Sequence, residues 1–316
     1  MVSPLASVVI PTCKRVRFLE AALASVERAR AAASLRADEL ECIVVDDGHD
    51  AETRALCSRA GVNLPVRYET SRHGPRAGPS ACRNQGVHTA RGEFIYLLDD
   101  DDTYCDNRFA KSLPLLRDKG YDMVLEPSLR EYVDEPSRPS YITGPCGEPS
   151  DAFRFMLTGG PETHITPGAT AFRKATFLAA GGYDEHLHYG EDGELLLRLC
   201  LYARVALVAG EPVTRIAIHS DNSTRPDRLR LWQNVHALSV LSRKVRRGPW
   251  PAQAALTAYE LAGKLDFVLT RYRLTAPSYP ARLKGGALAL WHFDWRCATA
   301  NNFRTIAVWL TRSRGA

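Results

Sequence analysis

Short apolar runs alternate with longer amphipathic stretches over the first 130 residues of the chain. Runs rich in Val, Ile, Leu and Phe predict buried β-strands, whereas apolar residues repeated on one helical face predict α-helices between them. Strands are predicted over Ser7–Ile10, Glu41–Val45, Val66–Glu69 and Phe94–Leu98, and helices over Arg17–Ala33, Ala51–Arg59, Pro79–Ala90 and Asn107–Lys119. This alternation is typical of an α/β fold with a mostly parallel sheet and helices on both faces.

The second half of the chain has a less regular pattern. Residues 126–165 are rich in Pro, Gly and Ser, which predicts a long excursion with one or two short strands, including Leu129–Val133. Further strands are predicted over Ala169–Phe172, Val205–Val208 and Val213–His219, and helices over Ala175–Ala180 and Glu194–Tyr202. From Pro226 onward the spacing of Leu and Trp predicts amphipathic helices.

Charge is divided unevenly along the chain, although the net charge is only +5. Residues 225–316 contain 16 Lys and Arg against 4 Asp and Glu, a balance of +12, which leaves −7 for residues 1–224. All five tryptophans also lie in this basic region. Two interpretations stay open: its helices contact an anionic membrane surface, or they pack on the rest of the chain or in a homodimer. No nucleic-acid-binding motif accompanies the charge, so no nucleic-acid partner is expected.

Composition narrows the class of protein. Apolar residues make up 45% of the chain and charged residues 24%, as in ordinary globular proteins, and no apolar run is long enough to span a bilayer. The eight cysteines are scattered without a Cys-x-x-Cys pair, which argues against a zinc site or a disulfide framework. No secretion leader is apparent. We therefore expect a cytoplasmic protein, with peripheral contact at the inner face of the membrane left open.

Polar residues follow three of the predicted strands at the point where each strand ends. Pro11 and Thr12 follow the first strand, Asp46 and Asp47 follow the second, and four consecutive aspartates, Asp99–Asp102, follow the fourth. Because ligands bind beyond the carboxyl ends of parallel strands, these residues are expected to share one edge of the sheet. Clustered carboxylates repel one another unless a cation lies between them, and hard divalent cations prefer oxygen ligands. The aspartates therefore predict a metal-assisted phosphate site, although a solvated turn or a set of helix caps would also explain them.

Several motifs together resemble glycosyltransferase family 2. They appear in the family's order as Ser7–Thr12, Val44–Gly48, Gly78–Gly86, Ala90–Asp102 and Gly181–Glu185, followed by Glu191–Asp192. The resemblance covers about residues 5–224 and implies a GT-A fold, an inverting reaction, a nucleotide-sugar donor and a divalent metal, Mn²⁺ or Mg²⁺. The Gln-x-x-Arg-Trp motif of processive polysaccharide synthases is absent, so transfer of a single sugar is expected.

The resemblance assigns donor-binding roles to the residues at the strand ends. Asp47, with Asp46, Pro11 and Thr12, would line the nucleobase pocket. The alternative is that Asp46 or Asp47 caps the helix that follows. Arg83 would face the donor, because an arginine fork suits phosphate or ribose oxygens, and a salt bridge to the aspartates is compatible with that role.

The segment Asp99–Asp101 resembles the family's Asp-x-Asp motif. Asp99 and Asp100 would contact the nucleotide sugar, and Asp99 and Asp101 would hold the metal. The resemblance adds His219 as a further metal ligand, although a lone histidine is more often structural.

Glu191 and Asp192 resemble the second carboxylate centre of the family. Inverting transfer needs a base that takes a proton from the acceptor hydroxyl, and the resemblance places that base at Asp192, with Glu191 orienting the acceptor. The alternative is a helix N-cap. Gly193 departs from the aromatic residue that many members carry, which leaves that space open.

These observations predict a GT-A catalytic domain over residues 1–224, with a nucleotide-sugar half at about 1–125 and an acceptor half at about 126–224. A basic, Trp-rich, α-helical C-terminal extension is predicted over residues 225–316. We expect a hexosyltransferase of bacterial glycan or glycoconjugate synthesis, with a UDP-sugar as the first candidate donor and a saccharide, lipid-linked or other hydroxyl acceptor. The alternative is a catalytically silent nucleotide-sugar-binding or scaffolding protein. A nucleotidyltransferase is disfavoured, because the Gly-rich basic loop that would grip a triphosphate is missing.

Overall fold

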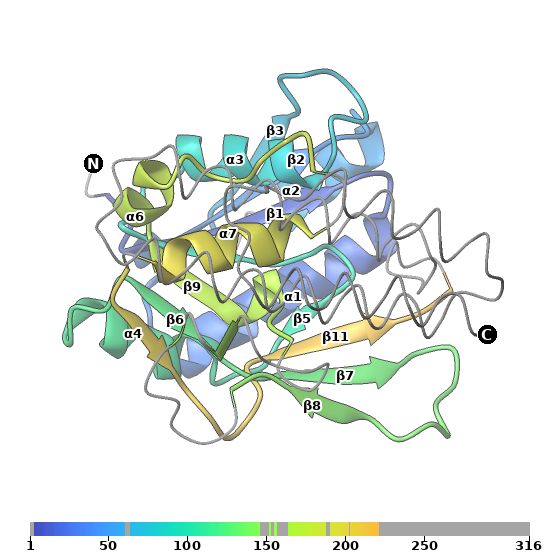
Figure 1. Cartoon of the computed structure of the whole chain (residues 1–316). Coiled ribbons are helices and arrows are strands. Elements are labelled where there is room, and N and C mark those ends of the chain that lie inside the picture. Colours follow the sequence, from blue (N-terminus) through green and yellow to red (C-terminus); the bar gives the residue numbers. More distant parts are fainter. Residues whose placement is uncertain are drawn as a thin grey trace, which may run out of the picture. The chain divides into compact units, whose positions relative to one another are not determined.

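The computed structural model describes residues 3–60, 64–145, 152, 155–156, 164–187, 190–201 and 203–220 (Figure 1). Two compact units are formed: one contains Met1–Glu185 and Leu199–Asn222, and the other contains His186–Arg198 and Ser223–Ala316. The predicted C-terminal helices of residues 225–316 lie outside the described residues, and the predicted domain boundaries stay predictions. Among the described residues, no helix is both long and apolar enough to cross a membrane.

A seven-stranded, mostly parallel sheet forms the centre of the first unit, which confirms the predicted α/β class. Its strands, in chain order, are β1 (Ala6–Thr12), β2 (Leu40–Asp46), β3 (Val66–Thr70), β4 (Phe94–Leu97), β6 (Met123–Leu125), β9 (Thr170–Arg173) and β10 (Val205–Leu207). Their spatial order is β10-β6-β9-β4-β1-β2-β3. Only β9 runs against its neighbours β4 and β6, while the other pairs are parallel.

Helices cover both faces of this sheet, as the alternating pattern predicts (Figure 1). They are α1 (Val16–Ala32), α2 (Ala51–Ala60), α3 (Pro79–Thr89), α4 (Arg108–Arg117) and the short α6 (Lys174–Ala179). On one face, Val8 and Ile10 of β1 join Leu23 of α1 and other apolar side chains of α1, α2 and α4 in the main core. On the other face, α3 approaches closely at Gly86, where an added Cβ would come within 2.3 Å of Val9 Cγ1. Glycine is therefore required there by packing against the sheet.

A second, smaller sheet has the order β5-β11-β7-β8. Its strands are β5 (Thr103–Tyr104), β7 (Ser128–Tyr132), β8 (Tyr141–Thr143) and β11 (Thr214–Ile218). β7 and β8 are the short strands expected between residues 126 and 165. β11 pairs with β5, which directly follows the four aspartates, and so it returns the chain to them. The two-residue β5 is too short to be recognised from a sequence pattern.

The helix predicted from Glu194 begins one turn earlier, as α7 (Glu191–Cys200). The Glu194 amide donates to the Gly190 carbonyl at 2.9 Å, which closes the first helical turn. Glu191, Asp192 and Glu194 all lie in that turn. Their negative charges interact favourably with the positive end of the helix dipole, which accounts for the earlier start. Two single 3₁₀ turns complete the described elements, η1 (Ala37–Glu39) and η3 (Pro167–Ala169).

Candidate active site

Thr12 joins the three polar strand ends that the sequence predicts to converge. The parallel register places it opposite Asp46. Its carbonyl accepts a hydrogen bond from the Asp47 amide at 2.8 Å. Its hydroxyl donates to Asp100 Oδ2 at 2.7 Å. The carboxyl ends of β1, β2 and β4 therefore form one polar edge, with Pro11 buried beside Thr12.

Asp46 is fully buried, and its carboxylate forms hydrogen bonds to neighbouring residues. It accepts hydrogen bonds from the amides of Gly48 at 2.8 Å and Asp50 at 2.6 Å. The Tyr68 hydroxyl donates to the same carboxylate at 2.8 Å, and burial raises the pKa of Tyr68 to about 12. These bonds hold the turn between β2 and α2. The cap of α2 is Asp50, whose carboxylate accepts the Thr53 amide at 2.9 Å, and not Asp46 as the alternative had it.

Asp47 fastens the loop that leads into α3. Its two carboxylate oxygens accept the amides of Ala77 at 2.8 Å and Gly78 at 2.9 Å. Its carbonyl accepts the Arg76 amide at 3.0 Å, although Arg76 itself has a left-handed backbone with φ of 68°. The Asp47 side chain is only slightly exposed at this edge. It therefore positions the start of the helix that carries Arg83.

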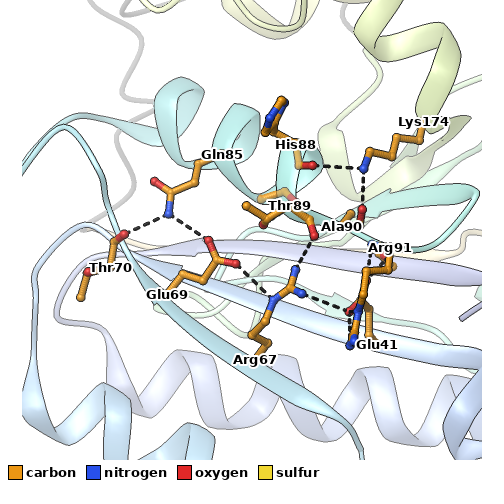
Figure 2. A network of polar contacts seen from close by, with 12 residues as sticks. Glu41, Arg67, Glu69, Thr70, Gln85, His88, Thr89, Ala90, Arg91 and Lys174 are labelled. Carbon is orange, nitrogen blue, oxygen red and sulfur yellow. Dashed lines mark hydrogen bonds and ion pairs between the residues drawn. The ribbon is translucent and has the colours of Figure 1, made fainter. Parts of the chain in front are cut away.

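A polar network holds the other end of the same loop (Figure 2). The Gln85 amide of α3 donates to Glu69 Oε2 at 3.0 Å and to the Thr70 carbonyl at 2.9 Å. Its Oε1 accepts the Arg72 backbone amide at 2.8 Å, two residues after the end of β3. Arg67 continues the network, because it lies 3.1 Å from Glu69 and donates to the Thr89 carbonyl at 2.7 Å. The loop from residue 71 to 78 is thus bonded at both ends to the sheet and to α3.

Arg83 forms an ion pair with the first aspartate of the run. Its Nη2 lies 2.5 Å from Asp99 Oδ1, and the arginine is 4% exposed. The guanidinium also lies over the Tyr183 ring, with 5.3 Å to the ring centroid. Asn84, the next residue, donates to the Tyr183 carbonyl and accepts its amide. Two motifs about 100 residues apart are therefore bonded to each other.

Asp100 and Asp101 share one cation, Arg15, which the sequence reasoning did not single out. Arg15 Nη1 lies 3.2 Å from Asp100 Oδ1 and 2.8 Å from Asp101 Oδ2. Burial raises the pKa of Asp100 to about 6, although Thr12 and Arg15 act in the opposite direction. The position of Arg15 in the sequence could have indicated this contact. Arg15 is a basic residue on the loop that follows β1, at the edge where the aspartates were expected.

His219 also reaches this cluster, from the end of β11. Its Nε2 lies 3.3 Å from Asp101 Oδ2, and its side chain is 4% exposed. The imidazole stacks on Phe18 of α1, with ring centroids 4.9 Å apart and an interplanar angle of 11°. The structure therefore brings together two residues that the sequence could connect only through a family resemblance.

Asp102 has a different role from the three aspartates before it. It accepts the Ala217 amide at 3.1 Å, which ties the aspartate run to β11. Burial raises the pKa of Asp102 well above its usual range, and the charges of Asp99 and Asp101 act in the same direction. The last residue of the run thus helps to bring His219 to the site.

The side chains expected to bind the metal suit a divalent cation. Two carboxylates, Asp99 and Asp101, and one imidazole, His219, are ligands that Mn²⁺ accepts. Asp101 and His219 are already in contact, whereas Asp99 faces Arg83. Within the described ranges, no three His, Cys, Asp or Glu side chains are arranged to hold a metal ion. The residue types therefore fit a metal, and its binding would require rearrangement of the ion pairs.

Glu191 and Asp192 lie on the first turn of α7, in the second unit, and both are partly buried. An added Cβ at Gly193 would meet no described atom within 4 Å, so the described residues leave space for a side chain there. The catalytic roles expected of Glu191 and Asp192 stay predictions.

Known proteins resemble this chain in sequence and in fold. A β-1,3-glucosyltransferase of Campylobacter jejuni, named as acting on GalNAc(5)-diNAcBac-PP-undecaprenol, is 31% identical over 100 residues, which are 31% of this chain and 30% of that protein. The crystal structure of S. aureus TarS 1–349 with UDP-GlcNAc superposes with a TM-score of 0.68 at 16% identity, covering 92% of this chain and 82% of that one. The mannosyltransferase PcManGT of Pyrobaculum calidifontis, in complex with GDP-Man and Mn²⁺, gives a TM-score of 0.54 at 17% identity, covering 99% and 87%.

The structural matches show that the fold is GT-A, as expected. The model of the family described as glycosyl transferase family 2 matches residues 7–179, more than half of the chain. The matched region contains the edge formed by β1, β2 and β4 together with all four aspartates. The chain therefore belongs to glycosyltransferase family 2.

Proposed function

We propose that this glycosyltransferase is an inverting, metal-dependent and non-processive enzyme that moves one sugar from a nucleotide-diphosphate sugar to a hydroxyl acceptor. The observation that carries the proposal is the edge where Asp99, Asp100 and Asp101 meet Thr12, two arginines and His219. Carboxylates at such an edge suit a metal, and guanidinium groups beside them suit phosphate oxygens.

Each residue at this edge has a role in the proposal. Asp99, Asp101 and His219 would hold Mn²⁺ or Mg²⁺, which when bound offsets charge on the leaving nucleoside diphosphate. Asp100 would contact the donor, and Arg83 would add a guanidinium fork for its phosphate or ribose oxygens. Asp47 would contact the nucleobase beside Thr12. Its carboxylate would do so while it still accepts hydrogen bonds from the Ala77 and Gly78 amides.

Two of the relatives support a first choice of donor and acceptor. TarS was crystallised with UDP-GlcNAc, which supports a UDP-sugar, and the Campylobacter protein is named for a lipid-linked acceptor. A UDP-hexose and a saccharide or polyprenyl-linked acceptor are therefore the first to test. A cytoplasmic location, with membrane contact or dimerisation through residues 225–316, belongs to the same proposal.

Asp192 is the acceptor base of the proposal, and Glu191 orients the acceptor. An inverting reaction has a single displacement, so the base takes the acceptor proton as the acceptor oxygen attacks the anomeric carbon. Asp192→Asn should lower turnover by about 100-fold or more, the usual contribution of a general base, while UDP binds within about twofold of the wild-type affinity. The exposed Asp118→Asn variant is the matched control and should leave both values unchanged.

The test is release of nucleoside diphosphate from a panel of nucleotide sugars with lipid-linked and saccharide acceptors, in Mn²⁺ and then in EDTA. Metal-dependent release from one donor, with a product of opposite anomeric configuration by NMR, is the expected result. Nucleotide binding without turnover with any donor and acceptor would favour the silent binding or scaffolding protein. Release of pyrophosphate would indicate a nucleotidyltransferase.

A further inference from the structure

The guanidinium of Arg15 occupies a cation position within the aspartate cluster. One nitrogen, Nη1, contacts both Asp100 Oδ1 and Asp101 Oδ2, at 3.2 and 2.8 Å. The arginine side chain is 32% exposed, whereas those of Asp100 and Asp101 are 8% and 11% exposed. A partly exposed side chain with a single positive charge therefore pairs with two carboxylates that have little access to water.

The same oxygen of Asp101 is shared with the imidazole of His219. Asp101 Oδ2 is 2.8 Å from Arg15 and 3.3 Å from His219 Nε2. Arg15 directly precedes α1, and Phe18, one turn further along, stacks on His219. The start of α1 therefore holds both a cation and the imidazole against one carboxylate oxygen. Any other cation that binds this oxygen must compete with the guanidinium.

We infer that Arg15 is the resident counter-ion of the Asp100–Asp101 pair, and that a divalent cation binds by displacing it from Asp101. This inference rests on the proposed function, which supplies the cation. Displacement from Asp101 leaves Arg15 beside Asp100 and places its positive charge close to that of the metal. That charge is compensated when a nucleoside diphosphate, which is anionic, binds at the same edge. Arg15 therefore makes metal binding and nucleotide binding depend on each other, a reciprocal coupling between two ligands.

The inference predicts an effect on metal binding that is opposite to the effect of misfolding. Removal of Arg15 should strengthen the binding of metal alone, because a competitor and a repelling charge are both lost. A partly exposed ion pair contributes little binding free energy, so its loss should raise the Mn²⁺ affinity without nucleotide by only about fivefold. The factor by which UDP strengthens Mn²⁺ binding should fall by about the same amount. Misfolding would instead weaken the binding of both ligands.

The test is titration of the full chain with Mn²⁺, followed by the EPR signal of the free ion, with and without UDP. A pH of 8 keeps protons from competing at Asp100, whose pKa is about 6. Arg15→Gln is compared with Arg17→Gln, which removes the same charge from an exposed side chain two residues further along α1. Arg17→Gln should behave like the wild type. Arg15→Lys keeps the charge and should lie between the wild type and Arg15→Gln.

The outcomes separate this inference from the proposed function. Tighter Mn²⁺ binding by Arg15→Gln supports the inference, even when the wild type binds Mn²⁺ only with UDP or not at all. Equal or weaker binding by Arg15→Gln overturns it, as does an equal gain in Arg17→Gln. The proposed function is judged independently by donor turnover, so a wild-type enzyme that transfers sugar without Mn²⁺ contradicts the metal dependence and not the transferase.

Discussion

Replacement of Thr12 by valine tests how the polar edge is held together. Thr12 and Asp100 are 4% and 6% exposed, and the hydroxyl donates to the carboxylate at 2.7 Å. Valine has nearly the same shape but no donor. A hydrogen bond to a charged group contributes about 1.5–3 kcal/mol to stability. Because one pKa unit corresponds to about 1.4 kcal/mol, the pKa of Asp100 should rise by about one to two units above its present value of about 6.

The pH dependence of stability follows from the direction of this shift. The folded-state pKa of Asp100 already lies above its unfolded value, so the folded state binds more protons and loses stability as pH rises toward 6. In Thr12→Val this loss should continue through about pH 7–8. Thr12→Ser keeps the donor and is the matched control. The difference in unfolding free energy between the two variants should be small at pH 5 and reach about 2 kcal/mol at pH 8.

Urea unfolding of both variants from pH 5 to 8 measures this difference, and carboxyl ¹³C NMR measures the pKa of Asp100 directly. An equal difference at both ends of the pH range would show that Thr12 acts through packing and not through the charge of Asp100. An unchanged Asp100 pKa in Thr12→Val would refute the reasoning in the same way.

Two further predictions concern stability and are checked by urea unfolding. Arg108 and Glu126 form a fully buried ion pair, so Arg108→Met should cost about 3–5 kcal/mol by leaving a buried charge without its partner. The double variant with Glu126→Leu should recover most of that loss, and no recovery would argue against charge burial as the cause. Gly86→Ala should cost about 1–3 kcal/mol, because its Cβ would lie 2.3 Å from Val9 Cγ1. Val9→Ala should reduce that cost, and a stable Gly86→Ala single variant would contradict the close approach of α3.

Much of the candidate site could be predicted because the ends of parallel strands lie at the same edge of a sheet. Apolar runs mark the strands, and strands that run parallel end at one edge, so residues after β1, β2 and β4 must meet there. Thr12, Asp47 and Asp100 do so through direct hydrogen bonds. What the pattern could not show was how each carboxylate is used. Asp46 and Asp47 accept backbone amides in the structure, and Arg15 contacts two aspartates.

The strand β9 was predicted, but its antiparallel direction and its place in the sheet were not, and the two-residue β5 escaped prediction. β9 lies between β4 and β6 in space, although β6 follows β4 along the chain and β9 comes later. Strand type and strand length do not encode the partner of a strand, because pairing depends on the packing of the whole sheet. The helix α7 was predicted, but not its first turn, which the Gly190–Glu194 hydrogen bond closes and which contains three acidic residues.

The amino-acid sequence by itself determined the α/β class, the family and the residue types at the edge of the sheet. These follow from local patterns, in which apolar spacing sets the elements and short motifs set their ends. Only the tertiary structure decided which charges meet. Asp101 and His219 are 118 positions apart, and Arg15 and Asp101 are 86 apart. Such contacts arise when separate elements pack together, and no local pattern along the chain contains them.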